Sequence, residues 1–198
     1  MLHYLVIVGA TAQLLGILSY IRNTIKGKTR PNRVTWLLWA LAPMIGTVAA
    51  LSDGVRWAIL PVFMAGFGPL LVLIASFFNK QSYWQLKPFD YLCGLFSLLA
   101  MVLWAITRQP EVAIVFAILS DAFAAIPTLM KSWTHPETES IGPFIGGVLS
   151  QSTAFFAIQT WTLTSVAFPS YLVILNLWFI AIMTRYRFTH KKKEQHGR

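Results

Sequence analysis

Residues 112–130 read VAIVFAILSDAFAAIPTLM, a largely apolar run with a single charged residue, Asp121. A helix that crosses a bilayer needs roughly 20 predominantly apolar residues, so this stretch is long enough to span a membrane. Reading outward from it for similar runs bounded by charges or turn residues predicts seven spans. We expect them at residues 4–21, 34–52, 57–78, 89–107, 112–130, 141–159 and 165–184.

Composition supports the same fold class. Of the 198 residues, 56% are hydrophobic and only 12% are charged, whereas a soluble domain carries about 25% charged residues. Seven spans leave too few residues for an appended ATPase, kinase or nucleic-acid-binding module. The sequence therefore predicts an all-α, polytopic membrane protein. Cys93 is the only cysteine, so no disulfide can form within the chain.

The positive charges sort by loop. All of the 16 Lys and Arg residues except Arg56 and Arg108 lie in the loops after spans 1, 3 and 5 or in the C-terminal tail. Because basic loops stay on the cytoplasmic side of a membrane, we expect the N-terminus outside and the C-terminus in the cytoplasm. The net charge of +9 then reflects topology and attraction to an anionic inner leaflet, and we expect no nucleic-acid partner.

Two of the basic loops resemble each other. Residues 26–35 and 131–140, which lie 105 positions apart, both read K-x-x-T-x-P-x-x-x-[ST]. An even number of spans separates them, so both loops fall on the same side of the membrane, and spans 1–3 and 5–7 form parallel repeats. The predicted units are a three-helix repeat at 1–80, a linker helix at 81–110, a second repeat at 111–187 and a basic tail at 188–198.

This 3+1+3 plan resembles the SWEET, semiSWEET and PQ-loop transporter superfamily. Ile126-Pro127-Thr128, Lys131-Ser132 and Ser140-Ile141-Gly142-Pro143-Phe144 are similar to the PQ-loop pattern, in which a proline precedes a Lys-Ser turn and Ser-x-x-Pro opens the next helix. The resemblance implies transport by rocking of two bundles. It also implies hinges at Pro127 and Pro143, and a substrate contact at Asn176 in the last helix.

Polar residues near span centres are candidate site residues, because a polar side chain is costly in hydrocarbon. Asp121, Gln13, Gln151 and Asn176 occupy a similar depth in four predicted spans. Such a set is what a midplane solute site requires. Hydrogen bonds that only hold helices together are the alternative. With no Lys or Arg inside a span, Asp121 must be neutral, hydrated by a cavity or matched to a cationic solute.

Trp36 and Trp39 place two indoles on one face of span 2, where they could stack a planar ring. Their W-x-x-W spacing is similar to a motif of PnuC-type vitamin transporters, which share the 3+1+3 plan. Membership of the inner interfacial belt is the alternative for Trp36.

Prolines inside spans form the last class of signal. Pro43 removes a hydrogen bond from the Trp39 carbonyl, and Pro127 does the same to Phe123. Such positions can serve as hinges or expose carbonyls to a solute.

The sequence contains no catalytic motif such as H-E-x-x-H or G-x-S-x-G, and we expect neither an enzyme nor a metal or cofactor. We predict a transporter of a small polar solute, sugar or sugar-like, that is either facilitative or proton-coupled. A non-transporting receptor or sorting protein on the same scaffold and a PnuC-like transporter of a ring-containing vitamin are the alternatives. An oligomer is compatible with this prediction but not required by it.

Overall fold

The computed structural model describes residues 3–52, 59–80, 83–107, 109–158 and 160–196, and these contain helices but no strand. The expectation of an all-α chain is confirmed. The α-helices are α1 (His3–Ile25), α2 (Arg33–Ser52), α3 (Leu60–Ala75), α4 (Pro88–Ile106), α5 (Pro110–Thr134), α6 (Gly142–Ala154) and α7 (Leu163–His196). Two short 3-10 helices, η2 (Pro136–Thr138) and η3 (Phe155–Ala157), follow α5 and α6.

Four of these helices are long and apolar enough to cross a membrane: α1, α4, α5 and α7. This agrees with a membrane protein, while the number of seven spans stays a prediction. Helix α6 has 13 residues, which cover about 20 Å at 1.5 Å per residue. It is shorter than the predicted span 141–159 because the chain tightens into η3 after Ala154.

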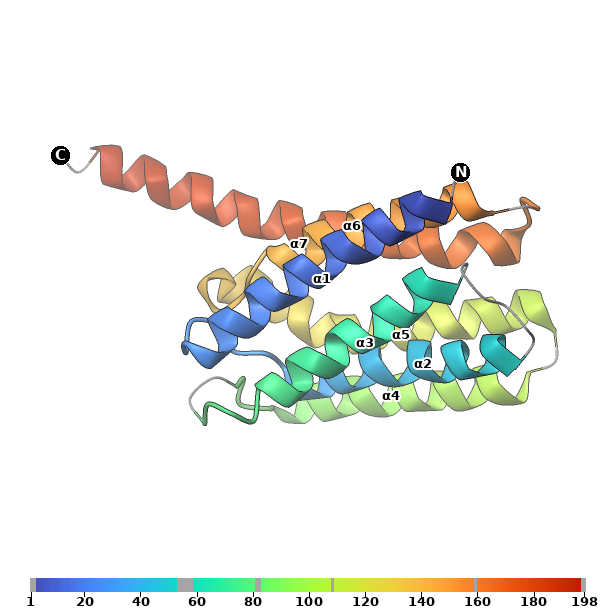
Figure 1. Cartoon of the computed structure of the whole chain (residues 1–198). Helices are drawn as coiled ribbons and strands as arrows, with labels where there is room; N and C mark the ends of the chain where they lie inside the picture. Colours follow the sequence, from blue (N-terminus) through green and yellow to red (C-terminus); the bar gives the residue numbers. More distant parts are fainter. Residues whose placement is uncertain (1–2, 53–58, 81–82, 108, 159, 197–198) are drawn as a thin grey trace.

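Helix α7 continues past the expected end of the last span at residue 184 and includes most of the predicted tail, ending at His196. Between Pro169 and Gly197 the sequence holds no glycine or proline and is rich in Lys, Arg, Glu and Gln near its end, which are good helix formers. In Figure 1 this helix projects well beyond the rest of the molecule. Helix α3 begins at Leu60 and ends at Ala75, close to the bounds of the predicted span 57–78. Residues 57 and 58 of that span lie outside the described residues.

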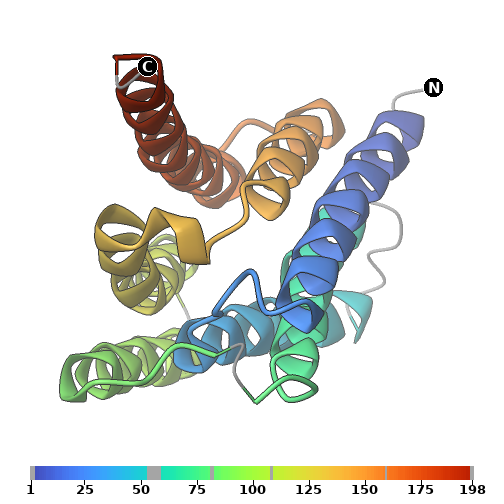
Figure 2. The same cartoon turned by 90° about the vertical axis from the view of Figure 1, so that its left-hand side faces the viewer.

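Six helices form a closed ring around the long axis. Helix α3 packs against α1 and α2, α7 packs against α5 and α6, and the ring is completed by α1 on α6 and α2 on α5. Figure 2, a view along the helices, shows the order α1, α3, α2, α5, α7, α6 with α4 outside the ring. Helix α4 packs against α5 and α2.

Glycines bring α1 and α6 together. A Cβ on Gly16 would collide with the main chain of Gly142, and one on Gly146 would lie 2.6 Å from the Cα of Gln13. The spacing Gly142-x-x-x-Gly146 therefore serves close helix packing, as such motifs do in membranes. The glycines near Gln13 therefore allow α1 and α6 to pack closely, and no open space is left between these two helices.

The two ends of the ring differ in charge. We call the end formed by residues 26–32, 76–80, 83–87 and 135–141 the basic end, and it lies at the left of Figure 1. Five of the ten Lys and Arg residues that precede α7 lie in these segments, and Arg22, Arg33 and Lys131 lie at the helix ends beside them. The aromatic core, in which Tyr20, Trp36, Phe144 and Phe179 are almost completely buried, fills the ring on the basic-end side of Asp121.

Candidate functional site

A small and a large cavity lie next to each other between the described helices. The smaller, of about 70 Å³, is lined by residues from all six ring helices, and we call it the small cavity. Each of the six predicted binding residues lines it: Gln13, Trp36, Trp39, Asp121, Gln151 and Asn176. Residues from five helices that are distant in sequence therefore meet at one place, although their binding of a solute stays a prediction.

The large cavity, of about 370 Å³, extends from the small cavity toward the end opposite the basic end. Asp121 and Gln151 line both cavities, so they lie at the junction. Its walls are mostly apolar, with Trp104 and Phe168 among them. The volume falls within the roughly 300–1,000 Å³ typical of small-molecule pockets, which are also mainly apolar with a few polar groups.

Asp121 has one strong partner. The Tyr171 hydroxyl of α7 donates a hydrogen bond of 2.9 Å to Oδ2 of Asp121, and the indole N–H of Trp39 lies 3.4 Å from the Asp121 main-chain oxygen. Among the described residues no Lys or Arg forms an ion pair with this carboxyl group. Its remaining acceptor capacity is therefore available to the cavities.

Several other polar atoms of the small cavity lack partners among the described residues. Gln13 donates from Nε2 to the Met64 carbonyl at 3.3 Å, but its buried Oε1 accepts no hydrogen bond. The indole N–H of Trp36 is likewise buried and unpaired. A buried polar group without a partner costs about 1–3 kcal/mol, and both atoms have almost no accessible surface, so they are enclosed by neighbouring side chains.

The two amides from the second half of the chain differ from each other. Asn176 donates from Nδ2 to the Leu172 carbonyl of its own helix at 2.7 Å, and its Oδ1 lies against Gly147 of α6. Gln151 is 5% exposed, and its side-chain amide forms no hydrogen bond with another described residue. Interhelical hydrogen bonding, the alternative explanation for such residues, therefore does not account for Gln151.

The rings of Trp36 and Trp39 are not parallel to each other. The rings of Trp36 and Trp39 meet edge to face, with centroids 5.4 Å apart and an interplanar angle of 84°, so no flat slot separates them. Trp36 is only 2% exposed, which does not fit a residue of an interfacial belt. Both rings line the small cavity and contribute an aromatic wall to it.

The predicted hinge prolines fall in two places. Pro43 and Pro143 line the small cavity, whereas Pro127 is buried near the basic end of α5 and lines neither cavity. Pro69 of α3 lines the small cavity too, and Ala65, whose carbonyl it deprives of a hydrogen bond, lines both. Breaks in two helices thus lie beside the cavities.

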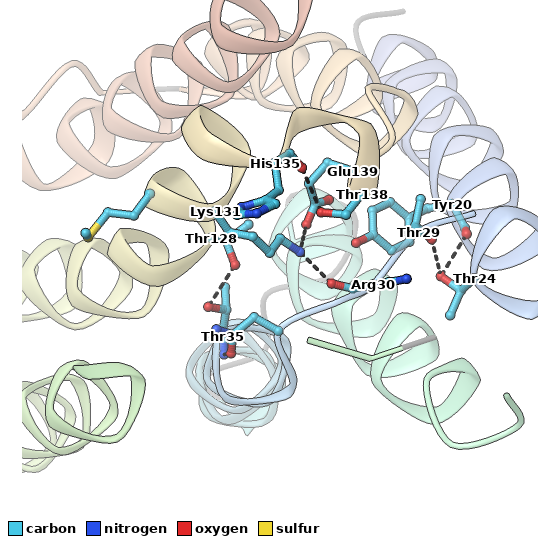
Figure 3. Close-up of polar contacts among 12 residues, drawn as sticks. Tyr20, Thr24, Thr29, Arg30, Thr35, Thr128, Lys131, His135, Thr138 and Glu139 are labelled. Carbon is cyan, nitrogen blue, oxygen red and sulfur yellow. Dashed lines mark hydrogen bonds and ion pairs between the residues drawn. The ribbon is translucent and has the colours of Figure 1, made fainter. Parts of the chain in front are cut away.

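A buried polar network closes the ring at the basic end. Lys131 pairs with Glu139, both nearly completely buried, and its Nζ donates a hydrogen bond of 2.6 Å to the Arg30 carbonyl. The Arg30 N–H donates to the Thr138 carbonyl at 2.9 Å. Figure 3 shows the two contacts of Lys131, one to the α1–α2 loop and one to Glu139 in the loop that follows α5.

A second contact continues this network between α2 and α5. The Thr128 hydroxyl donates to Thr35 Oγ1 at 3.0 Å, and both side chains are buried. We call the whole set the basic-end seal: Arg30, Thr35, Thr128, Lys131, Thr138 and Glu139. It joins the two predicted repeats across their K-x-x-T-x-P loops.

Sequence reasoning missed the seal and Tyr171. Lys131 is visible in the sequence as a loop charge and as part of the repeated loop motif, but no sequence pattern shows that Glu139 folds back onto it. The phenol of Tyr171 could have been noticed as a polar group inside an apolar span, but nothing in the spacing pairs it with Asp121.

Among the described residues no three His, Cys, Asp or Glu side chains gather as metal ligands. No family model, curated protein or solved structure matches this chain.

Proposed function

We propose that this protein is a membrane transporter that moves a small solute through the ring of helices by alternating access. The observation that carries this proposal is the convergence of incompletely paired polar groups from several helices on one internal cavity. Three residues of its lining support this: Asp121, whose carboxyl group receives one side-chain hydrogen bond, Gln151, whose amide forms none with the described residues, and Asn176, which bonds only within its own helix. Buried polar groups are normally paired, so their incomplete pairing is best explained by a polar ligand.

The cavity walls indicate the chemistry of the solute. Asp121 and Gln151 stand where the mostly apolar large cavity meets the small one, so the polar part of a solute would lie there. A small polar solute, sugar or sugar-like, is the first candidate. The aromatic and apolar walls favour a second candidate, a ring-containing vitamin of the kind carried by PnuC-type transporters, whose flat face would lie against Trp39 or Phe168.

We further propose that the chain consists of two parallel three-helix repeats joined by α4, as in the SWEET-like superfamily. Support comes from the packing pairs, because exchanging α1 with α5, α2 with α6 and α3 with α7 leaves the six contacts of the ring unchanged. An approximate twofold axis through the centre of the ring, parallel to the helices, would produce this pattern. The K-x-x-T-x-P loops of the two halves also contact each other in the basic-end seal.

In this proposal the seal is one of two gates. The polar network closes the basic end, whereas the large cavity extends toward the other end, so the conformation is ready to receive solute from that side. The positive-inside rule puts the basic end in the cytoplasm, and the conformation is then outward-facing. Transport requires the contacts of Lys131 and Thr128 across the two halves to break.

The test is uptake into proteoliposomes of radiolabelled glucose, sucrose and thiamine. Gln151→Leu removes a cavity-lining amide that forms no hydrogen bond with the described residues, so the variant should fold and should take up the transported solute about tenfold more slowly, the effect of one lost polar contact. Gln109→Leu, at an exposed site before α5, is the matched control and should transport normally. Uptake no faster than in empty liposomes for every solute, or equal uptake by Gln151→Leu and wild type, would contradict the proposal.

A further inference from the structure

A third cavity, of about 350 Å³, lies outside the ring at the basic end. We call it the basic pocket, and its lining residues are Arg30, Lys80, Tyr83, Trp84, Gln85 and Lys87. Three of these six are cationic and none is acidic. Its volume is within the range of roughly 300–1,000 Å³ for small-molecule sites.

Other residues hold the pocket walls in position. The main-chain N–H of Trp84 donates a hydrogen bond of 3.1 Å to the Pro31 carbonyl. This bond holds the α3–α4 loop against the α1–α2 loop. The Tyr83 ring stacks on the Arg33 guanidinium, with its centroid 4.4 Å from the Arg33 Cζ atom. The aromatic part of the pocket is therefore built against the body of the protein.

The neighbouring acidic groups are already engaged. Asp90 accepts hydrogen bonds from Asn32 Nδ2 at 3.1 Å and from the Lys87 N–H at 2.6 Å. Glu139 pairs with Lys131 inside the seal. The side-chain charges of Arg30, Lys80 and Lys87 are not paired with a carboxylate of the described residues, so like charges meet around a cavity that an anion can occupy.

We propose that the basic pocket binds a phosphate-bearing anion. A guanidinium offers planar, forked donors that match phosphate oxygens, and lysine ammonium groups add point charges. A phosphate group has enough oxygens to meet Arg30, Lys80 and Lys87 at once, whereas a carboxylate has only two. The phosphate comes from the headgroup of an anionic lipid or from a soluble phosphate compound.

Binding in this pocket acts on the basic-end seal through Arg30. Arg30 lines the pocket, and its main chain donates to Thr138 and accepts from Lys131. An anion held between Arg30 and the two lysines ties the α3–α4 loop to the seal and stabilises the sealed conformation. This regulatory step rests on the proposed transport function, whereas anion binding itself does not.

Binding is tested first on the purified full chain. Calorimetry with inorganic pyrophosphate in detergent probes soluble phosphate, and thermal stability in phosphatidylcholine nanodiscs with and without phosphatidylglycerol probes the lipid headgroup. Lys80→Gln/Lys87→Gln should weaken binding about tenfold or more, because each lost charge-assisted hydrogen bond is worth about 1.5–3 kcal/mol. Lys26→Gln/Lys28→Gln removes the same charge from exposed positions at the same end and should bind normally.

The pattern of results decides the source of the phosphate. Pyrophosphate binding that depends on Lys80 and Lys87 assigns a soluble anion, and stabilisation by phosphatidylglycerol alone assigns a lipid. Absence of both effects, or equal losses in the two double variants, overturns the site.

The regulatory step has its own readout. In a Cys93→Ala background, Thr35→Cys places a thiol at the buried contact between α2 and α5, which reacts with a maleimide only when the seal parts. The anion should slow this reaction severalfold, since it stabilises the sealed state. An unchanged rate with anion bound overturns the regulation but leaves the site, while failure of solute uptake in proteoliposomes would overturn transport alone.

Discussion

The basic-end seal and the small cavity are both buried and both contain polar groups, but they treat those groups in opposite ways. In the seal, Lys131 has Glu139 and the Arg30 carbonyl as partners, and Thr128 has Thr35. In the cavity, the Gln151 amide forms no hydrogen bond with the described residues, and the Asp121 carboxyl group receives one side-chain hydrogen bond, from Tyr171. Paired groups hold one conformation, whereas unpaired ones are available to a ligand.

This contrast separates two uses of buried polar groups that look alike in a sequence. Lys131 and Asp121 are both ionisable residues of α5. Lys131 meets an opposite charge and becomes part of a latch between the two halves of the chain. Asp121 meets no opposite charge among the described residues, and its contacts are with the Tyr171 phenol and the Trp39 indole.

Breaking the seal should have the largest effect on stability. Lys131→Met leaves Glu139 as an uncompensated buried charge, which typically costs about 3–5 kcal/mol. Thermal unfolding followed by tryptophan fluorescence in detergent should show a clearly lower Tm. Lys26→Met changes the corresponding residue of the other repeat, which is exposed, and should leave the Tm nearly unchanged. The double variant Lys131→Met/Glu139→Gln should recover much of the loss, and equal Tm values for the Lys131 and Lys26 variants would refute the latch.

Neutralising Asp121 should abolish a function rather than the fold. Asp121→Asn keeps an acceptor for Tyr171 but cannot change its charge, so folding should persist while pH-dependent or cation-dependent uptake is lost. Asp121→Leu also leaves the Tyr171 hydroxyl unpaired and should cost about 1–3 kcal/mol of stability. Uptake is measured against pH for wild type and both variants. Superimposable curves for wild type and Asp121→Asn would remove this carboxyl group from the mechanism.

Two adjacent glycines of α6 distinguish packing from the site. An added Cβ at Gly146 would lie 2.6 Å from the Gln13 Cα, whereas one at Gly147 would lie 2.6 Å from the Asn176 Oδ1. Gly146→Ala should therefore destabilise the α1–α6 contact by about 1–3 kcal/mol. Gly147→Ala should displace a side chain and raise the KM for uptake severalfold with a smaller change in Tm. Identical Tm losses with unchanged KM would place Asn176 outside the binding site.

The smallest effect is expected at Pro127, which lines neither cavity. If α5 flexes there when the seal opens, Pro127→Ala restores a helix hydrogen bond, stiffens the helix and slows uptake severalfold at constant KM. Pro43→Ala alters the cavity wall and should change KM as well. Unchanged maximal uptake in Pro127→Ala would assign this proline to static shape.

The sequence alone was sufficient for the helical fold class and for the set of polar residues that meet at the cavity. Apolar runs of helical length leave few alternatives to helices in a membrane, and a polar residue at the centre of such a run is costly enough to be noticed. Gln13, Asp121, Gln151 and Asn176 could be selected on this ground without knowing which helices are neighbours.

Only the tertiary structure decided which polar groups are paired and which are not. The closing of the ring by α1 on α6 and α2 on α5 brings Tyr171 to Asp121 and the α1–α2 loop to Lys131, contacts between residues far apart in the chain. A sequence pattern records the polarity of each residue but not its partner, since pairing depends on how helices pack side by side. The distinction between latch and site is therefore a property of the packed ring.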